Sequence, residues 1–263
     1  TGSFFRTFSS MLALAIILGA GAAIANAQAF TEGFDTVVAP TGGTGSAPIP
    51  NWWAQNNSVP VGTTTWFQGN TTVFTSHSGA TNSYIGANFN NTTGTNTISN
   101  WLLTPNRTFS NGDQIKFYTR TTTANPFPDR MQVRLSTNGA STNVGTGSIA
   151  VGDFTTLLLD INPVYDTGGA YPETWTQFTI TISGLAGPTS GRVAFRYFVE
   201  LGGPTGDNSN FIGIDTFEYV PAAAPATDAP VDFNGDSKTD FVVVRNTGGG
   251  SGGQVTWFWN LNG

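Results

Sequence analysis

The segment VDFNGDSKTDFVVVR, residues 231 to 245, places acidic and amide side chains at alternate positions directly before a run of valines. Alternate side chains of such a loop can converge on one point, where a backbone carbonyl adds a further oxygen ligand. Calcium takes about six to eight oxygen ligands at about 2.3–2.6 Å, which suits this set. We therefore predict a calcium site formed by Asp232, Asn234, Asp236, the Lys238 carbonyl and Asp240. A solvated acidic turn without metal is the alternative.

Two further carboxylates, Glu32 and Asp215, lie in segments that alternate aromatic and polar residues. Strict alternation places Asp215 on the face of Phe211 and Phe217 in FIGIDTFEY, and Glu32 on the phenylalanine face of AFTEGFD. An ionised carboxylate among aromatic side chains is costly unless it is paired or bound to a metal. If the first and last strands meet, we expect Glu32 and Asp215 to share a structural calcium.

Two alternatives to that shared calcium remain open. Each carboxylate could pair with an arginine, such as Arg196 or Arg134. The alternation could also be broken at Gly33 or Gly213, which would turn a carboxylate away from the aromatic face.

Tryptophans in the early part of the chain are candidate ligand-binding residues. Exposed aromatic rings at Trp52, Trp53 and Trp66 could stack on sugar rings. Neighbouring strand residues point to opposite faces, so at most one of Trp52 and Trp53 is expected to be exposed. Burial of these rings in the core is the alternative.

The residues give little support for catalysis. His77 is the only histidine, and nothing beyond the adjacent Ser76 and Ser78 suggests a serine–histidine–aspartate triad. One histidine and no cysteine cannot supply the ligands of a zinc site. The glycine-rich stretch 248–253 matches two catalytic motifs by composition alone, and no helix pattern follows it. We predict no catalytic residue and no enzymatic activity.

Composition indicates the elements that must position these residues. The chain has 263 residues, of which 10% are charged, with a net charge of −6 and no cysteine. Nucleic acid is an unsuitable partner because its binding needs a basic surface. Threonine and 20 phenylalanines favour strands, whereas 33 glycines favour turns, so the composition indicates an all-β protein.

The chain divides into four parts by pattern. Residues 1–27 have the charge, apolar run and small-residue cleavage site of a signal peptide, which predicts a secreted or cell-surface protein with no membrane span after removal. Residues 28–220 form the main domain, and 221–230 read as an extended Pro/Ala linker. Residues 231–263 carry two strand-like runs that would pair as a hairpin, which is marginal alone, so we expect repeats to follow.

The main domain shows short alternating runs separated by turn residues, as in a β-sandwich or jelly roll. Its predicted strands are 30–35, 64–68, 72–75, 83–88, 99–104, 114–123, 129–137, 154–160, 174–183, 191–200 and 211–220.

The succession from WFQGN through ISNWLLTP (98–105) to FRYFV and FIGIDTFEY resembles the choice-of-anchor J domain, a relative of cleaved-adhesin and MAM-like jelly rolls. This resemblance implies an extracellular binding domain, with calcium in several relatives and no settled activity. The acidic loop and following strands resemble the start of an FG-GAP/VCBS-type repeat of β-propeller blades, which implies calcium. Ser237 stands where such loops usually have glycine.

These observations together predict an exported, calcium-binding, adhesin-like jelly roll followed by an incomplete propeller-type repeat. Its expected partners are surface glycans, extracellular matrix or other copies of itself. A carbohydrate-binding accessory module of a secreted hydrolase and a self-assembling fibre subunit are the alternatives.

Overall fold

The structure is a computed structural model that describes residues 28–40, 45–223, 241–248 and 254–260. Its elements, in chain order, are β1 (Phe30–Glu32), β2 (Trp53–Asn56), β3 (Phe67–Gln68), β4 (Ile85–Asn88), the 3-10 turn η1 (Phe89–Asn91), β5 (Asn96–Leu103), β6 (Arg107–Phe109), β7 (Gln114–Thr121), β8 (Met131–Ser136), β9 (Thr156–Ile161), β10 (Thr176–Thr181), β11 (Thr189–Gly202), β12 (Phe211–Val220), β13 (Phe241–Gly248) and β14 (Gln254–Asn260).

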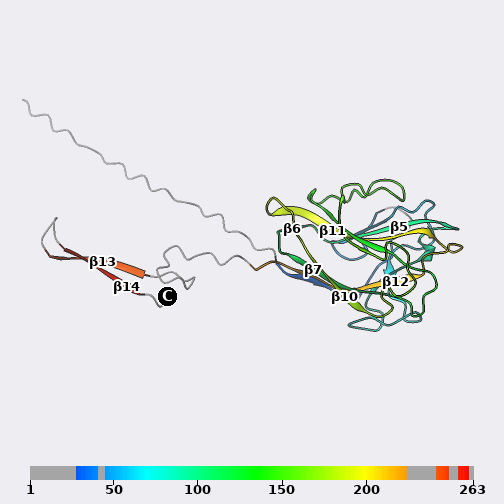
Figure 1. The fold of residues 1–263 in the computed structure, drawn as a ribbon, viewed down its shortest axis with the longest axis horizontal. Coiled ribbons are helices and arrows are strands. Elements are labelled where there is room, and N and C mark those ends of the chain that lie inside the picture. Colours follow the sequence, from blue (N-terminus) through cyan, green and yellow to red (C-terminus); the bar gives the residue numbers. More distant parts are fainter. Residues whose placement is uncertain (1–27, 41–44, 224–240, 249–253, 261–263) are drawn as a thin grey trace, which may run out of the picture.

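Two antiparallel sheets form a β-sandwich between β1 and β12. Sheet A has the strand order β10-β7-β12-β4-β3, with β1 also paired to β12. Sheet B has the order β2-β5-β11-β8-β9, with β6 also paired to β11. Figure 1 shows the two layers, with β5, β6 and β11 in one and β7, β10 and β12 in the other. The chain crosses repeatedly between the sheets, as in a jelly roll. The predicted all-β sandwich is therefore confirmed.

The core lies between the sheets and is rich in aromatic side chains. Strand β7 alternates strictly, with Ile115 and Phe117 buried and their neighbours partly exposed. Phe117 meets Phe195 of the opposite sheet edge-on, at 4.9 Å between ring centroids. Such aromatic pairs stabilise the fold by more than the apolar area they bury. The inward-facing residues of each strand therefore hold the two sheets together.

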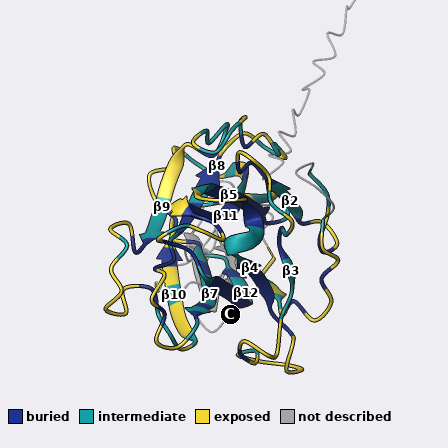
Figure 2. Cartoon of the chain, turned by 90° about the vertical axis from the view of Figure 1, so that its right-hand side faces the viewer, coloured by how far each residue is buried: buried dark blue, intermediate teal, exposed yellow. Residues whose placement is uncertain are grey.

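Loops cover the outer faces of both sheets. Phe74 and Tyr84 pack against Phe211 on the outer face of sheet A, and Val144 and Phe154 pack on that of sheet B. The central strands are consequently buried on both faces, which Figure 2 shows in dark blue.

One predicted strand is wrong, and two observed strands were not predicted. Residues 72–75 form a turn and a coil segment, because Phe74 is a loop residue that packs on sheet A rather than a strand residue. The strands β2 and β6 were not predicted, because neither the polar stretch of β2 nor the three residues of β6 carry a clear alternation.

The last described elements are β13 and β14, which pair antiparallel as the expected hairpin. The signal peptide, most of the linker and the acidic loop 232–240 lie outside the described residues. In the described part of the chain, no helix has the length and apolar character needed to span a bilayer.

Candidate functional site

The three predicted tryptophans do not form an exposed platform. Trp66 is fully buried, and Trp52 is 2% exposed and packs against Phe34 and Phe217 in the core. Trp53 is partly buried against the outer cluster of sheet B. The prediction that Trp52 and Trp66 bind sugars is therefore wrong, because the sandwich uses both rings to fill its interior.

Asp215 faces away from the core. A β-bulge follows it, where Thr216 adopts a positive φ of 49°, so the alternation reverses and Phe217 points inward while Asp215 points outward. Its Oδ2 accepts hydrogen bonds from the backbone N of His77 (2.8 Å) and of Ser78 (3.1 Å). Burial raises the pKa of Asp215, and these backbone hydrogen bonds oppose that rise. Asp215 thus anchors the loop over sheet A.

Glu32 lies on the opposite face of the same sheet. It stands across from the inward-facing Phe217, and its Oε1 accepts a hydrogen bond from the backbone N of Phe34 at 2.8 Å. Burial raises the pKa of Glu32, and the nearby Asp35 adds to the rise. Although β1 and β12 meet as expected, the structure does not bring Glu32 and Asp215 together, and the idea that they share one ion needs correction.

Neither Arg196 nor Arg134, the two arginines proposed as alternative partners, pairs with Glu32 or Asp215. Arg196 donates to Ser99 and Gln132, and Arg134 donates to Gln132 and to the Phe154 carbonyl. Within the described ranges, no three histidine, cysteine or acidic residues gather as a metal-binding group. The calcium ligands predicted in 232–240 lie outside the described residues.

His77 takes a structural position. Its ring stacks on Tyr118 with 3.6 Å between centroids, and its Nδ1 lies 3.0 Å from Thr216 Oγ1. Ser76 Oγ donates to the Ala80 carbonyl, and Asp215 accepts a hydrogen bond from the backbone N of His77 rather than from its ring. Ser76, His77 and Asp215 therefore do not form the hydrogen-bonded chain of a serine–histidine–aspartate triad.

An open groove at the β3 edge of sheet A is the candidate site. It has a volume of about 760 Å³, and its walls come from the loop after β3, the end of β4 with η1, and the start of β12. The residues that line it are Thr64, Phe67, Gln68, Gly69, Asn70, Thr71, Val73, Asn82, Asn88, Phe89, Asn210 and Phe211.

A close approach of two phenylalanines builds the floor of the groove. Phe67 and Phe211 lie 5.5 Å apart between ring centroids, above the β4 backbone at Gly86. A Cβ at residue 86 would lie 2.9 Å from the Phe67 ring, so only glycine leaves room for it. Gln68 then fixes the edge, because its amide bonds to the Val37 N and the Phe34 carbonyl.

Several amide groups of the wall keep unused hydrogen-bonding capacity. Among described residues, Asn88 uses only its Oδ1, which accepts from Thr64 Oγ1 (2.7 Å) and the Asn90 N (3.1 Å). Asn210 uses only its Nδ2, which donates to Thr122 and Asn125. The exposed Asn82 has a side-chain amide with no partner in this part of the chain. The groove therefore offers both donors and acceptors to a ligand.

A second, smaller depression of about 230 Å³ adjoins the groove and shares Phe89 and Asn210 with it. Its other walls include Pro126, Phe127 and Pro204, and Phe127 is 45% exposed. The two depressions therefore form one continuous surface that joins at Phe89 and Asn210.

A buried carboxylate holds Asn210 in place. Asp129 Oδ1 accepts from the Asn210 N (2.8 Å) and Tyr197 Oη (2.5 Å), and its Oδ2 accepts from Thr121 Oγ1 (2.6 Å). Burial raises the pKa of Asp129, against the effect of these hydrogen bonds. This carboxylate positions the groove wall without entering the groove.

The residues that line the groove carry no charged side chain and no pair of nucleophile and base. Neutral amides, hydroxyls and aromatic edges are suited to binding a neutral hydroxyl-rich ligand, since each hydroxyl both donates and accepts a hydrogen bond. The arrangement can bind and orient such a ligand.

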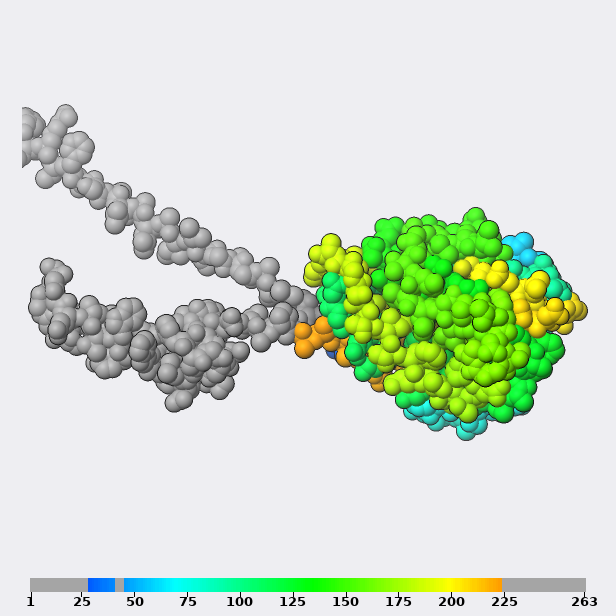
Figure 3. Space-filling model, in the orientation of Figure 1, coloured from blue at the N-terminus to red at the C-terminus, as the bar shows by residue number. Residues whose placement is uncertain are grey.

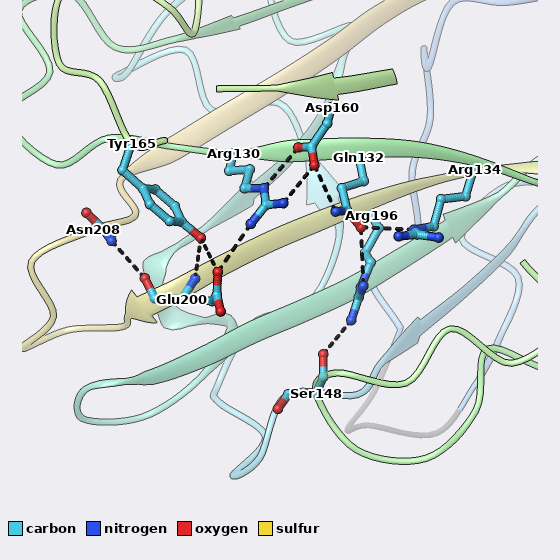
Figure 4. Close-up of polar contacts among 9 residues, drawn as sticks. All are labelled: Arg130, Gln132, Arg134, Ser148, Asp160, Tyr165, Arg196, Glu200 and Asn208. Atoms are coloured by element: carbon cyan, nitrogen blue, oxygen red, sulfur yellow. Dashed lines mark hydrogen bonds and ion pairs between the residues drawn. The ribbon is translucent and has the colours of Figure 1, made fainter. Parts of the chain in front are cut away.

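A charged cluster on the outer face of sheet B is a structural clamp rather than a site. Arg130 pairs with Asp160 through two hydrogen bonds, of 2.9 and 2.7 Å, and with Glu200 at 3.2 Å. Arg196 donates to the Ser148 carbonyl and so ties the covering loop to β11 (Figure 4). Burial lowers the pKa of Arg196 to about 9. All three side-chain nitrogens of Arg130 and of Arg196 donate to partners within the protein, so these two guanidinium groups are used in holding the fold.

Local sequence patterns contain only weak signals for the groove. Its asparagines occur in ordinary turn-like stretches, such as NFNN at 88–91 and NSN at 208–210, which usually indicate loops. Only the pairing of β12 with β4 brings Asn210 beside Phe89. That pairing joins residues more than 100 positions apart, and no local pattern encodes it.

A profile of the cleaved adhesin domain family matches residues 41–215. This match covers more than half of the chain, so the chain belongs to the cleaved adhesin domain family. The sandwich is thus an adhesin-type domain. The more specific likeness to a choice-of-anchor J domain, and that of 231–263 to an FG-GAP repeat, stay predictions.

Solved structures give more distant similarities. A cleaved adhesin domain of Lys-gingipain from Porphyromonas gingivalis is 21% identical, with 75% of this chain and 99% of that chain covered and a TM-score of 0.48. A second such domain of Lys-gingipain is 20% identical, with 73% and 97% covered and a TM-score of 0.45. The C-terminal carbohydrate-binding module of a marine laminarinase from Zobellia galactanivorans is 11% identical, with 73% and 99% covered and a TM-score of 0.31. Comparison with curated proteins gives no match.

Proposed function

We propose that this chain is a non-enzymatic, adhesin-like binding protein of the cell exterior, and that its sandwich binds neutral glycans in the groove beside β3. The observation that carries this proposal is the lining of the groove, where amides with unused donors and acceptors surround phenylalanine rings without any charged side chain. Membership of the cleaved adhesin domain family supports a binding role at a surface. The signal-peptide pattern of residues 1–27 supports export.

The ligand should be a chain rather than a single sugar. The second depression continues the groove past Phe89, so a longer oligosaccharide gains contacts that a monosaccharide lacks. An adhesin and an accessory module of a secreted hydrolase would both bind a glycan at such a site. The groove therefore supports glycan binding without distinguishing these two roles.

Calorimetry with neutral hexasaccharides, such as cellohexaose, xylohexaose and mannohexaose, tests this proposal on the full chain. We expect at least one to bind, and Asn82→Ala to weaken it by about 3- to 10-fold, the value of one neutral hydrogen bond. Thr71→Arg should block the groove, whereas Thr156→Arg on the distant strand β9 should leave binding unchanged. Equal binding by Thr71→Arg and the unmodified chain would place the ligand elsewhere.

We further propose that residues 232–240 bind one calcium ion through the oxygens predicted above. Three carboxylates in nine residues repel each other unless a dication lies among them, which supports the assignment. Calorimetry with CaCl₂ on the full chain should detect a single site that Asp236→Asn weakens. The matched control is Asp207→Asn at an exposed position. If Asp236→Asn bound calcium with the same heat and affinity as the unmodified chain, residues 232–240 would be excluded as the calcium site.

A further inference from the structure

The open edges of the two sheets differ in how they are protected against pairing with another strand. Sheet A ends in β3 and β10, and sheet B ends in β2 and β9. Exposed edges are ordinarily protected by shortness, a charged residue, a proline, a bulge or a covering segment. Strand β3 has two residues, and the backbone of Ser46 bonds to Ala54 of β2. Strand β9 carries Asp160 and pairs with β8 across a register shift.

Within the described residues, strand β10, with the sequence TQFTIT, lacks all of these protective features. Six consecutive residues pair with β7 without a register shift, and the strand contains no proline. Residues 174–191, which include β10 and its flanks, contain no Asp, Glu, Lys or Arg. Figure 2 shows β9 and β10 as exposed strands along one side of the sandwich. The face in view in Figure 3 consists largely of the green to yellow-green part of the chain that contains them.

The backbone polar groups of β10 alternate between the sheet and its open side. Just beyond the strand, Ile182 exchanges backbone hydrogen bonds with Asp113 and Gly112, both at 2.8 Å. Because hydrogen-bonding direction alternates along an antiparallel strand, Ile180 and Phe178 also face β7 with their backbone groups. Gln177, Thr179 and Thr181 then direct their N–H and C=O groups outward.

The side chains of β10 make the strand complementary to itself. Ile180 and Phe178 point to the core, whereas Thr179 and its neighbours Gln177 and Thr181 are exposed on the other face. In an antiparallel pair centred on Thr179, Phe178 of each copy stands opposite Ile180 of the other. Apolar residues then meet apolar residues and threonine meets threonine, and no like charges oppose each other.

We infer that β10 is a docking edge for a second copy of this chain. The two copies pair antiparallel about a two-fold axis at Thr179, which joins both A sheets into one continuous sheet. The contact is small, so association is weak and would gain strength from many copies on one surface. This inference does not depend on glycan binding, because β10 contributes no residue to the groove.

Sedimentation velocity of the full chain from micromolar to millimolar concentration tests the inference. The chain should show a reversible monomer–dimer equilibrium. Thr179→Lys should make it monomeric by placing two like charges opposite each other, and Thr179→Pro should do so by removing an outward N–H. The matched control Thr156→Lys, on edge strand β9, should dimerise as the unmodified chain does. All variants should keep the melting temperature of the unmodified chain within a few degrees.

Two results would overturn the inference. One is a chain that stays monomeric over the whole range, and the other is a dimer that persists unchanged in Thr179→Lys. Because the chain has no cysteine, oxidation of Thr179→Cys gives an independent reading of the register. A pair centred there has a Cα separation of about 5.5 Å, which a disulfide can span. Thr179→Cys should therefore form covalent dimers much faster than Thr156→Cys, and equal rates would contradict the proposed pairing.

Discussion

At the scale of single residues, acidic side chains in this domain fasten loops. Asp215 binds two backbone amides of the loop over sheet A, and Asp129 gathers Tyr197, Thr121 and Asn210 around one carboxylate. Sequence reasoning correctly singled out Asp215 as a carboxylate that needs partners. It assigned the wrong partners, because the bulge at Thr216 reverses the strand faces in a way that alternation alone cannot predict.

Asp129 should leave a signature in the pH dependence of stability. Burial raises its pKa in the folded protein above the usual value of about 3.9. At pH values between the pKa of Asp129 in the unfolded state and its raised pKa in the folded state, the folded state binds a proton that the unfolded state does not bind. Stability from this group is therefore present below about pH 4 and is lost as the pH rises through the raised pKa. The melting temperature of the unmodified chain should therefore fall as the pH rises through this range. Asp129→Asn should remove this fall, whereas the control Asp207→Asn, at an exposed position, should retain it.

At the scale of elements, a loop covers the outer face of each sheet, so that the central strands are buried on both faces. Residues 138–155 lie over sheet B, and Arg196 of β11 holds them through the Ser148 carbonyl while it stacks against Trp101 and Phe198. The sequence indicated the strands well, since alternation is local. It did not indicate these loops as structural elements, because their glycine- and asparagine-rich composition is that of any exposed turn.

Replacing Arg196 tests the role of this loop attachment. Arg196→Ala removes the stacking and the hydrogen bonds to Ser99, Gln132 and the Ser148 carbonyl, which should lower stability by about 2–4 kcal/mol. Hydrogen exchange should become faster for the amides of 143–152 before it does so for β11. The half-buried Lys116→Ala, on β7 of the opposite sheet, is the control. Unchanged exchange in 143–152 would mean that Arg196 does not hold this loop.

At the scale of the whole molecule, the groove is a product of topology. Pairing of β12 with β4, and of β4 with the short strand β3, assembles one surface from three distant parts of the sequence. The composition predicted the fold class because it reflects average preferences of strands and turns. The site required knowledge of which strands are neighbours, and the tryptophans chosen from sequence were needed for the core instead.

We propose that a neutral glycan binds in the groove beside β3. Side-chain amide resonances report on this directly, because the groove contains Asn70, Asn82, Asn88 and Asn210, whereas Asn56 and Asn100 are buried in the domain interior. Titration of the ¹⁵N-labelled full chain with the hexasaccharide that binds in calorimetry should shift the four groove amides and leave the two buried amides unmoved. Shifts confined to residues outside the groove, or none at saturating ligand, would contradict the claim.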